Sequence, residues 1–379
     1  MFHYLDSAAT TPVRPEAAQA AAEVMVRDWG NPSAQYALGR QAAARLREWR
    51  GELAKALGCL PEEVFFTSCG SESDNWAIQG ALELNRRKGN HILTTAIEHA
   101  AVLEPCKVLE GRSYEVTYLQ PGRDGTITPE QVAAALRPDT ILVSMMLVNN
   151  ELGSILPVRE TARAIQAAGC PALLHCDAVQ GFLKLPFTPG ELGVDLLSVS
   201  GHKIHAPKGV GALYVRKGLK LPPLLRGGGQ ESGLRSGTEA TSQIAAFAAA
   251  ARLGAEALER NAAHMAQVKA YAIERLAREV PEAVVLTQGG APHILPISLP
   301  GYKSEVVVRF LSDRGVYISS GSACHRGGLS HVFKALKLPK THLDGALRIS
   351  FSYDTAHEDV DALIAVLSQA RKDLFPTLS

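Results

Sequence analysis

The chain has 379 residues, of which 46% are hydrophobic and 20% charged, a composition typical of a globular protein with a substantial core. Its 39 basic and 38 acidic residues leave a formal net charge of +1, which excludes a strong field attracting nucleic acid or a membrane surface. No segment has the apolar length of a membrane span and the start does not resemble a signal peptide, so we expect a cytoplasmic protein without direct nucleic-acid contacts.

Short apolar segments alternate with helical segments through the first two-thirds of the chain. We expect buried strands at residues 64–67, 91–95, 114–119, 140–146, 172–175, 196–200 and 211–215. Helix signals lie between them: apolar residues at helical spacing over 46–57 end at Gly58, and Thr128 with Gln131 forms a capping-box pattern. This alternation predicts an α/β fold, with a mostly parallel sheet covered by helices on both faces.

The pattern changes after about residue 255. A long helix is expected over 262–278, strands over 294–299, 317–319 and 347–351, and a last helix after a cap at Thr355 and Glu358. We therefore expect a large domain over residues 15–255. Residues 1–14 and 256–379 would form a smaller α+β domain.

Lys203 is the most informative residue of the chain. It follows an apolar run, Leu196 to Val199, through Ser200, Gly201 and His202. A partly desolvated amine at the end of a strand is well placed to form a Schiff base. Asp177 follows another apolar stretch, and pyridoxal phosphate needs such an acid for its pyridine nitrogen as well as a lysine. Taken singly, Lys203 could also be a surface residue and Asp177 a helix cap.

A phosphate site is predicted where the strand at 64–67 passes into a helix. Gly70 allows close approach of an anion, and Ser71 and Asp74 have capping-box spacing. An ordinary capped helix would show the same pattern.

Six cysteines, at positions 59, 69, 106, 170, 176 and 324, form no Cys-x-x-Cys pair, so neither a metal site nor a disulfide framework is expected. Cys324 differs from the others because serine, glycine, histidine and arginine surround it. Basic neighbours favour the reactive thiolate, although a structural thiol in a turn is the alternative.

Ordered motifs extend these observations over nearly the whole chain. They are Tyr4–Pro12, Gly30–Ser33, Phe66–Ser68, Glu72–Asn75, Glu98–His99, Val148–Glu151, His175–Gln180, Ser200–Lys203, Gly227–Glu231, Arg235–Thr238, Ser319–Cys324 and Arg348–Phe351. In this order they resemble the cysteine desulfurases, the NifS/IscS-like branch of the class V aminotransferase family. The resemblance implies a fold-type I pyridoxal-phosphate-dependent transferase, with a mostly parallel seven-stranded sheet in the large domain, a smaller α+β domain carrying the catalytic cysteine loop, and a homodimeric assembly.

The resemblance also implies a role for each site residue. Lys203 would hold pyridoxal 5′-phosphate as a Schiff base, Asp177 would contact the ring nitrogen, and His99 would stack on the ring. Asn150 and Gln180 would lie near the phenolic oxygen, and Arg348, with Asn150, would hold the substrate carboxylate. The phosphate would be bound by Gly70, Ser71, Ser200 and His202, with Thr238 reaching over from the second subunit.

The implied reaction converts L-cysteine to L-alanine. Lys203 would take the α-proton, Cys324 would attack the substrate sulfur and keep it as a persulfide, and His99 would shuttle protons. The acceptor would be an iron–sulfur scaffold protein or a tRNA-thiolation enzyme. A selenocysteine lyase, another class V aminotransferase or β-lyase, and a non-enzymatic scaffold are the alternatives.

The chain departs from the family pattern in three places. Cys69-Gly-Ser71 replaces a Gly-Ala-Thr segment, Tyr36 replaces a histidine, and the segment from Cys324 to Phe333 is shorter. The first change keeps a hydroxyl and a backbone donor for the phosphate. The shorter segment leaves the identity of the sulfur acceptor open.

Overall fold

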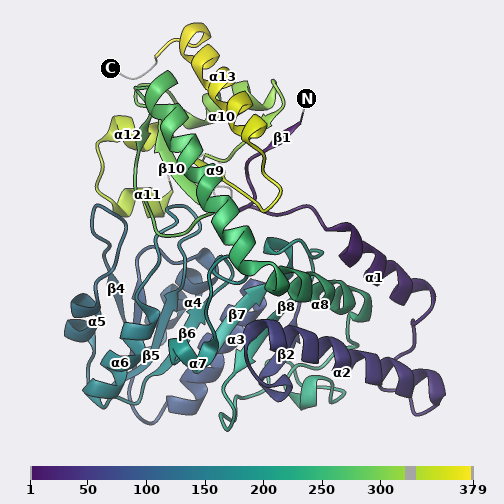
Figure 1. The fold of residues 1–379 in the computed structure, drawn as a ribbon. Helices are drawn as coiled ribbons and strands as arrows, with labels where there is room; N and C mark the ends of the chain where they lie inside the picture. Colours follow the sequence, from purple (N-terminus) through teal and green to yellow (C-terminus); the bar gives the residue numbers. More distant parts are fainter. Residues whose placement is uncertain (1, 321–329, 377–379) are drawn as a thin grey trace.

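The computed structural model describes residues 2–320 and 330–376. A broad α/β layer forms its larger part, and a smaller unit stands beside it (Figure 1). The long helix α9 (Leu258–Glu279) runs from one part into the other. Both chain ends lie at the smaller unit, so the N-terminal segment returns to the elements formed last in the chain.

The large sheet has seven strands, as expected. They are β2 (Val64–Thr67), β3 (His91–Thr95), β4 (Glu115–Leu119), β5 (Thr140–Met146), β6 (Leu173–Asp177), β7 (Leu196–Ser200) and β8 (Gly211–Val215). Their order is β2-β8-β7-β6-β5-β3-β4, and within this sheet only β8 is antiparallel to its neighbours. The prediction of an α/β fold with a mostly parallel sheet is confirmed. β6 extends two residues further than expected, which makes Asp177 its last residue.

Helices cover both faces of this sheet, and its central strands are therefore buried on both sides. One face packs against α3 (Gly70–Asn85) and α4 (Ala100–Glu110). The other packs against α1 (Pro15–Val26), α2 (Ala37–Leu57), α6 (Val158–Ala168) and α8 (Thr241–Glu256). The short helices α5 (Pro129–Ala135), α7 (Pro189–Leu192), η1 (Pro61–Glu63), η2 (Gly201–Lys203) and η3 (Glu231–Gly233) complete this part.

Two of the four predicted helix boundaries are confirmed and two are wrong. α2 ends at Gly58, whose φ of 72° suits glycine, and Thr128 caps α5 together with Gln131. Ser71 and Asp74 do not form a cap, because α3 begins at Gly70, before Ser71, and Asp74 is buried in the interior. The last helix, α13 (His357–Asp373), starts after Ala356, whose N–H donates to Asp359 and not to Glu358.

The smaller unit contains two small sheets. β12 (Ala346–Ser350), β10 (Ile294–Ser298) and β9 (Val284–Val285) are antiparallel, and β1 (His3–Tyr4) pairs in parallel with β11 (Val316–Tyr317). The remaining helices are α10 (Ser304–Ser312), α11 (His331–Ala335) and α12 (Lys340–Asp344). One buried cluster joins Leu5 to α9, α10 and α13, whereas Phe333 belongs to the cluster of the large sheet. The division near residue 255 stays a prediction.

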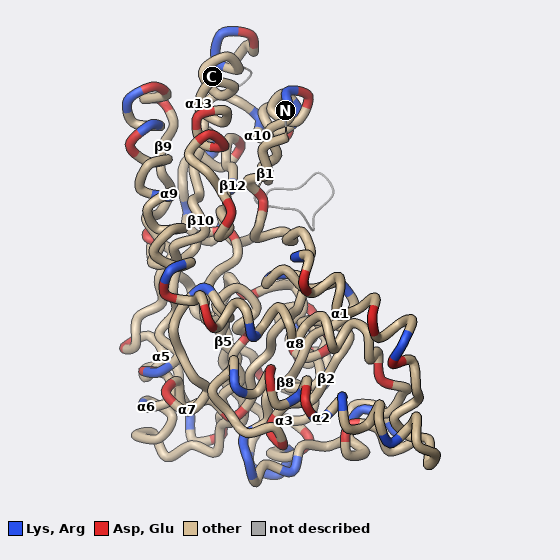
Figure 2. Tube along the Cα trace, turned by 45° about the vertical axis from the view of Figure 1, so that its right-hand side comes forward, with Lys and Arg blue, Asp and Glu red and all other residues tan. Residues whose placement is uncertain are grey.

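Acidic and basic residues are interspersed over both parts of the molecule (Figure 2), in keeping with the near-zero net charge. Among residues 2–320 and 330–376, no helix combines the length and the apolar character needed to cross a bilayer. In the same residues, no group of three or more histidine, cysteine or acidic side chains is arranged to hold a metal ion.

Candidate active site

Ten of the twelve predicted site residues line one cavity of about 300 Å³. They are Gly70, Ser71, His99, Asn150, Asp177, Gln180, Ser200, His202, Lys203 and Arg348. Thr238 is exposed and does not line this cavity, and Cys324 lies outside the described residues. The cavity forms at the carboxyl ends of β5, β6 and β7, where open α/β sheets usually bind ligands.

Lys203 is held in place by the N-terminal segment. Its Nζ donates hydrogen bonds to the backbone oxygens of Ala8, at 2.8 Å, and Ala9, at 2.7 Å. Thr11 fixes the same segment on η2, because its N–H and its hydroxyl both donate to the His202 carbonyl. The amine therefore projects into the cavity beside two carbonyl groups that come from almost 200 residues earlier in the chain.

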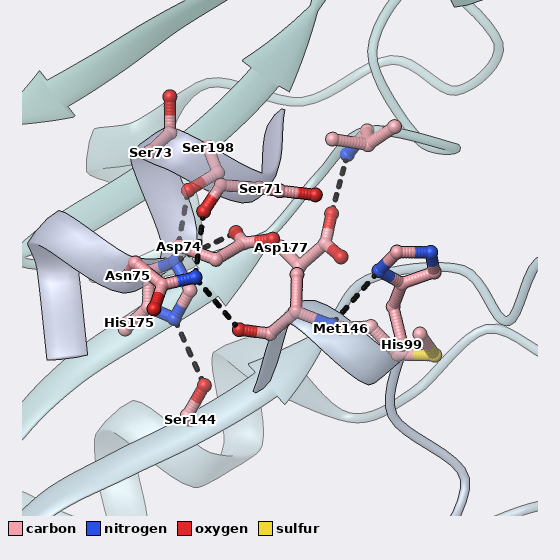
Figure 3. Close-up of polar contacts among 12 residues, drawn as sticks. Ser71, Ser73, Asp74, Asn75, His99, Ser144, Met146, His175, Asp177 and Ser198 are labelled. Carbon is pink, nitrogen blue, oxygen red and sulfur yellow. Dashed lines mark hydrogen bonds and ion pairs between the residues drawn. The ribbon is translucent and has the colours of Figure 1, made fainter. Parts of the chain in front are cut away.

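Asp177 places an almost fully buried carboxyl group in the cavity, with 6% of the residue exposed. One oxygen accepts the N–H of Val179 at 2.9 Å. Burial raises the pKa of Asp177, and the nearby carboxyl of Asp74 raises it further. His99, which Figure 3 shows close to Asp177, acts in the opposite direction. This carboxyl therefore has an unusually high affinity for a proton or for a cationic partner.

His99 caps the first turn of α4. Its Nδ1 accepts the N–H of Ala101 at 3.1 Å, so the neutral ring carries its proton on Nε2. Burial lowers the pKa of His99. A neutral imidazole in this position offers a flat ring to a ligand and a donor at Nε2.

The start of α3 provides an anion site. The amide groups of Gly70 and Ser71 belong to the first turn of a 16-residue helix, where backbone donors favour negative charge. A Cβ on Gly70 would lie 2.8 Å from a methyl carbon of Val179. The Ser200 hydroxyl is buried at the same cavity with no hydrogen-bond partner among the described residues. These groups suit a phosphate better than an apolar ligand.

Arg348 lies on β12 and is 2% exposed. Its guanidinium donates to Asp6 at 2.7 Å and to the backbone oxygen of Asn150 at 2.9 Å. Its Nε is buried without a hydrogen-bond partner among residues 2–320 and 330–376. One donor of a strongly basic group thus has no hydrogen-bond partner among the described residues, in a side chain that lines the cavity.

Gln180 links three parts of the molecule at the cavity. Its Nε2 donates to the Ala8 oxygen at 2.8 Å, and His293 contacts its Oε1 at 3.3 Å. Ala8 also accepts from Lys203, so Gln180 and Lys203 share one backbone acceptor. The Gln180 side chain, which follows β6 of the sheet, is thus held by the N-terminal segment and by the residue before β10.

Sequence reasoning missed two ionisable residues that line the cavity. Glu151 is buried, which raises its pKa to about 7. His331 contacts the backbone oxygen of Glu98 through Nε2 at 2.9 Å. Glu151 ends the Val148–Glu151 motif and His331 follows the segment of Cys324, so their positions in the sequence were signals. Asp74, interpreted above as part of a cap, is a third cavity residue.

Comparisons with known proteins find relatives that match nearly the whole chain. The family profile described as aminotransferase class-V matches residues 3–363. The chain is 39% identical to a protein named cysteine desulfurase IscS from Methanosarcina thermophila, over 97% of this chain and 91% of the relative. It is 36% identical to a protein of the same name from Clostridium botulinum, over 97% and 94%.

Solved structures with similar folds also cover nearly the whole chain. A NifS-like protein superimposes with a TM-score of 0.93 at 34% identity, covering 99% of this chain and all of the other. DndA from Streptomyces lividans superimposes with a TM-score of 0.76 at 37% identity, covering 92% and 99%. A structure described as SspA in complex with cysteine has a TM-score of 0.80 at 33% identity, covering 93% and 100%.

Proposed function

Because the chain belongs to the class V aminotransferase family, in its cysteine desulfurase branch, we propose that it converts L-cysteine to L-alanine and passes the sulfur on through a persulfide at Cys324. The single observation that carries the proposal is the joint presence of the Lys203 amine and the Asp177 carboxyl in one cavity. The guanidinium of Arg348 in the same cavity adds a site for an amino-acid carboxylate.

The residues of the cavity fit pyridoxal 5′-phosphate. Lys203 would anchor it covalently, Asp177 would pair with its ring nitrogen, and His99 would lie against the ring. Gly70, Ser71, Ser200 and His202 would hold the phosphate, and Asn150 and Gln180 would lie near the phenolic oxygen. When bound, the cofactor supplies an electron sink for the substrate carbon that loses its proton.

Arg348 would orient the substrate, because a guanidinium forms strong charge-assisted hydrogen bonds to a carboxylate. This orientation brings the α-carbon near Lys203. Once its nitrogen is free of the cofactor, Lys203 accepts the α-proton at Nζ. His99, neutral and carrying its proton on Nε2, is suited to move a proton beside it.

Cys324 would complete the reaction as a thiolate. Its sulfur attacks the substrate sulfur, so that an S–S bond forms and the substrate Cβ–S bond breaks. The bonding electron pair stays on the substrate carbon skeleton, which takes up a proton and becomes alanine. Of the described flanks of the Cys324 segment, Ser330 lines the cavity, and Ser319 forms a backbone bridge with Arg348, which also lines it.

Mass spectrometry tests the proposal directly. After incubation with L-cysteine, the peptide containing Cys324 should gain the mass of one sulfur atom, and dithiothreitol should remove it. L-Alanine should form in equal amount to the sulfur released. Alanine formation with no added sulfur on this peptide would contradict the persulfide route and favour a selenocysteine lyase or β-lyase type of reaction.

Asp6→Asn tests the substrate role of Arg348. The amide oxygen can still accept from the guanidinium but no longer competes as an anion, a difference of about 1 kcal/mol per hydrogen bond. We therefore expect KM for L-cysteine and the inhibition constant of L-alanine to fall about fivefold. Asp6→Ala removes the acceptor that positions the guanidinium, so the loss of orientation should outweigh the loss of competition and raise both values. Unchanged KM and inhibition constants in both variants would show that Arg348 does not bind the substrate carboxylate.

We also propose a cytoplasmic homodimer that serves a separate acceptor protein. Exposed Met25, Val26, Trp29 and Tyr36 gather on and after α1, as expected of a surface that a second subunit covers. The exposed position of Thr238 suits a contact with the phosphate of that second subunit. An iron–sulfur scaffold and a tRNA-thiolation enzyme both remain candidate acceptors, and an inactive scaffold role is disfavoured by the intact cavity.

A further inference from the structure

A buried polar cluster lies behind Asp177 and has no role in the mechanism above. It consists of Asp74 on α3, Ser144 on β5, His175 on β6 and Ser198 on β7 (Figure 3). All four are at most 1% exposed. Buried polar groups are costly unless they are paired, so such a cluster between a helix and a sheet needs an explanation.

The strands place this cluster directly beside Asp177. His175 and Asp177 are two residues apart on β6 and therefore point to the same face. Ser144 is the register neighbour of His175, and Ser198 is the register neighbour of Asp177. The cluster is thus built from three adjacent strands of the sheet.

His175 is saturated by its neighbours. Its Nδ1 lies 2.9 Å from the Ser144 hydroxyl and its Nε2 lies 3.0 Å from the Ser198 hydroxyl. Burial lowers the pKa of His175 to about 4, so the ring is neutral at physiological pH. It cannot provide a full positive charge to balance a neighbouring carboxylate.

Asp74 is the member of the cluster whose negative charge the neutral His175 ring does not balance. Its Oδ1 lies 3.5 Å from His175 Nε2 and has no hydrogen-bond partner among the described residues. Burial raises the pKa of Asp74 to about 7, and Asp74 in turn raises the pKa of Asp177. Two carboxyl groups thus share a water-excluded region at the side of the cavity where Asp177 lies.

We propose that Asp74 and His175 are positioning residues for Asp177, and that Asp74 adds a second negative charge that helps to keep the cofactor's ring nitrogen protonated. His175 holds the cluster rigid through its two serine contacts. A cation at Asp177 makes the ionised form of Asp74 more favourable, because opposite charges stabilise each other in a dry environment. The inference rests on the proposed function, since it requires a cofactor nitrogen at Asp177.

Other ionisable groups also surround Asp177, and none of them is substituted in the test below. They are Glu98 and His99 before α4, Lys203 on η2, and Cys176 on β6 itself. Glu98 is buried, and its pKa is raised to about 8, so it is mainly neutral near pH 7. Asp74 is therefore the residue to change.

The test is a pH titration of purified holoenzyme that carries pyridoxal phosphate labelled with 15N at the ring nitrogen, because the 15N chemical shift follows the protonation of that nitrogen. Asp74→Asn keeps the size of the side chain and removes its charge. We expect the midpoint of the titration to move about one unit to lower pH, which corresponds to about tenfold weaker proton binding. Cofactor retention on dialysis should also fall.

Ser73→Ala is the matched control. Ser73 is the neighbour of Asp74 on α3, is equally buried, and bonds to Thr67 at 2.7 Å. Ser198→Ala is a milder second variant if Asp74→Asn does not fold, and its midpoint should shift in the same direction by a smaller amount. An unchanged midpoint in a folded Asp74→Asn or Ser198→Ala holoenzyme, or an equal shift in Ser73→Ala, would overturn the inference.

The wild-type titration distinguishes this failure from failure of the proposed function. A wild-type protein that takes up pyridoxal phosphate and shows no visible absorption would contradict the cofactor site itself. A normal wild-type spectrum with an unmoved midpoint in the variants contradicts only the role of Asp74.

Discussion

Lys203→Ala should give a folded protein that lacks the visible absorption of the covalently held cofactor and converts no measurable L-cysteine. The side chain is expected both to anchor the cofactor and to accept the α-proton, so its loss removes two functions at once. General-base catalysis alone contributes about 10²- to 10⁴-fold, and kcat should fall by at least about 10³-fold. Absorption spectra after cofactor reconstitution and alanine formation measure the two effects separately.

Lys208→Ala is the matched control, because Lys208 lies five residues further along the same connection and is exposed. It should retain the spectrum and the activity. Lys184 is the informative alternative: it is buried, and burial lowers its pKa to about 8. A visible band that survives in Lys203→Ala and disappears in Lys184→Ala would move the cofactor anchor to Lys184.

The strands of the large sheet could be predicted from the sequence because most of them are short apolar segments with clear ends. All seven predicted strands exist. The largest error at a strand end is in β6, where the prediction stopped at His175 and missed Cys176 and Asp177. Burial on both faces lets a strand carry polar residues when neighbouring strands satisfy them. Ser144 and Ser198 do so for His175, and no local pattern announces that pairing.

The α3 boundary was wrong for a similar reason. Ser71 and Asp74 have the spacing of a capping box, but the structure uses Asp74 in the core. The turn before the helix is instead held by Glu72, which accepts the N–H of Ser68 at 3.1 Å. Arg235, 163 residues away, pairs with Glu72 at 2.7 Å and fixes it. A tertiary ion pair thus fixes the residue that holds this turn, and the local sequence does not show it.

Long-range contacts also explain what sequence reasoning could not supply at the site. The carbonyl groups that receive the Lys203 amine are backbone atoms of Ala8 and Ala9, which carry no chemical signal in their side chains. The partner of Arg348 is Asp6, 342 residues earlier in the chain. Family motifs identified the reactive side chains, whereas the groups that hold them depend on how distant segments meet.

Cys324→Ala should retain the cofactor spectrum and still bind L-cysteine, yet release sulfide and alanine at least about 10³-fold more slowly. Removal of a catalytic nucleophile typically costs this much or more. Lys203, Asp177 and Arg348 remain in the variant, so a spectral change on adding L-cysteine should persist. Stopped-flow spectra and alanine assays therefore separate substrate binding from sulfur transfer.

Cys170→Ala controls for the loss of a thiol, since Cys170 follows α6 and does not line the cavity. It should behave like the wild type. The comparison also decides between the reaction classes, because a β-lyase or a selenocysteine lyase need not depend on an enzyme thiol for release of the chalcogen. Undiminished sulfide and alanine production from L-cysteine in Cys324→Ala would therefore assign the chain to such a lyase reaction. Selective loss in Cys324→Ala alone would show that this thiol is required for sulfur release, as the persulfide route demands.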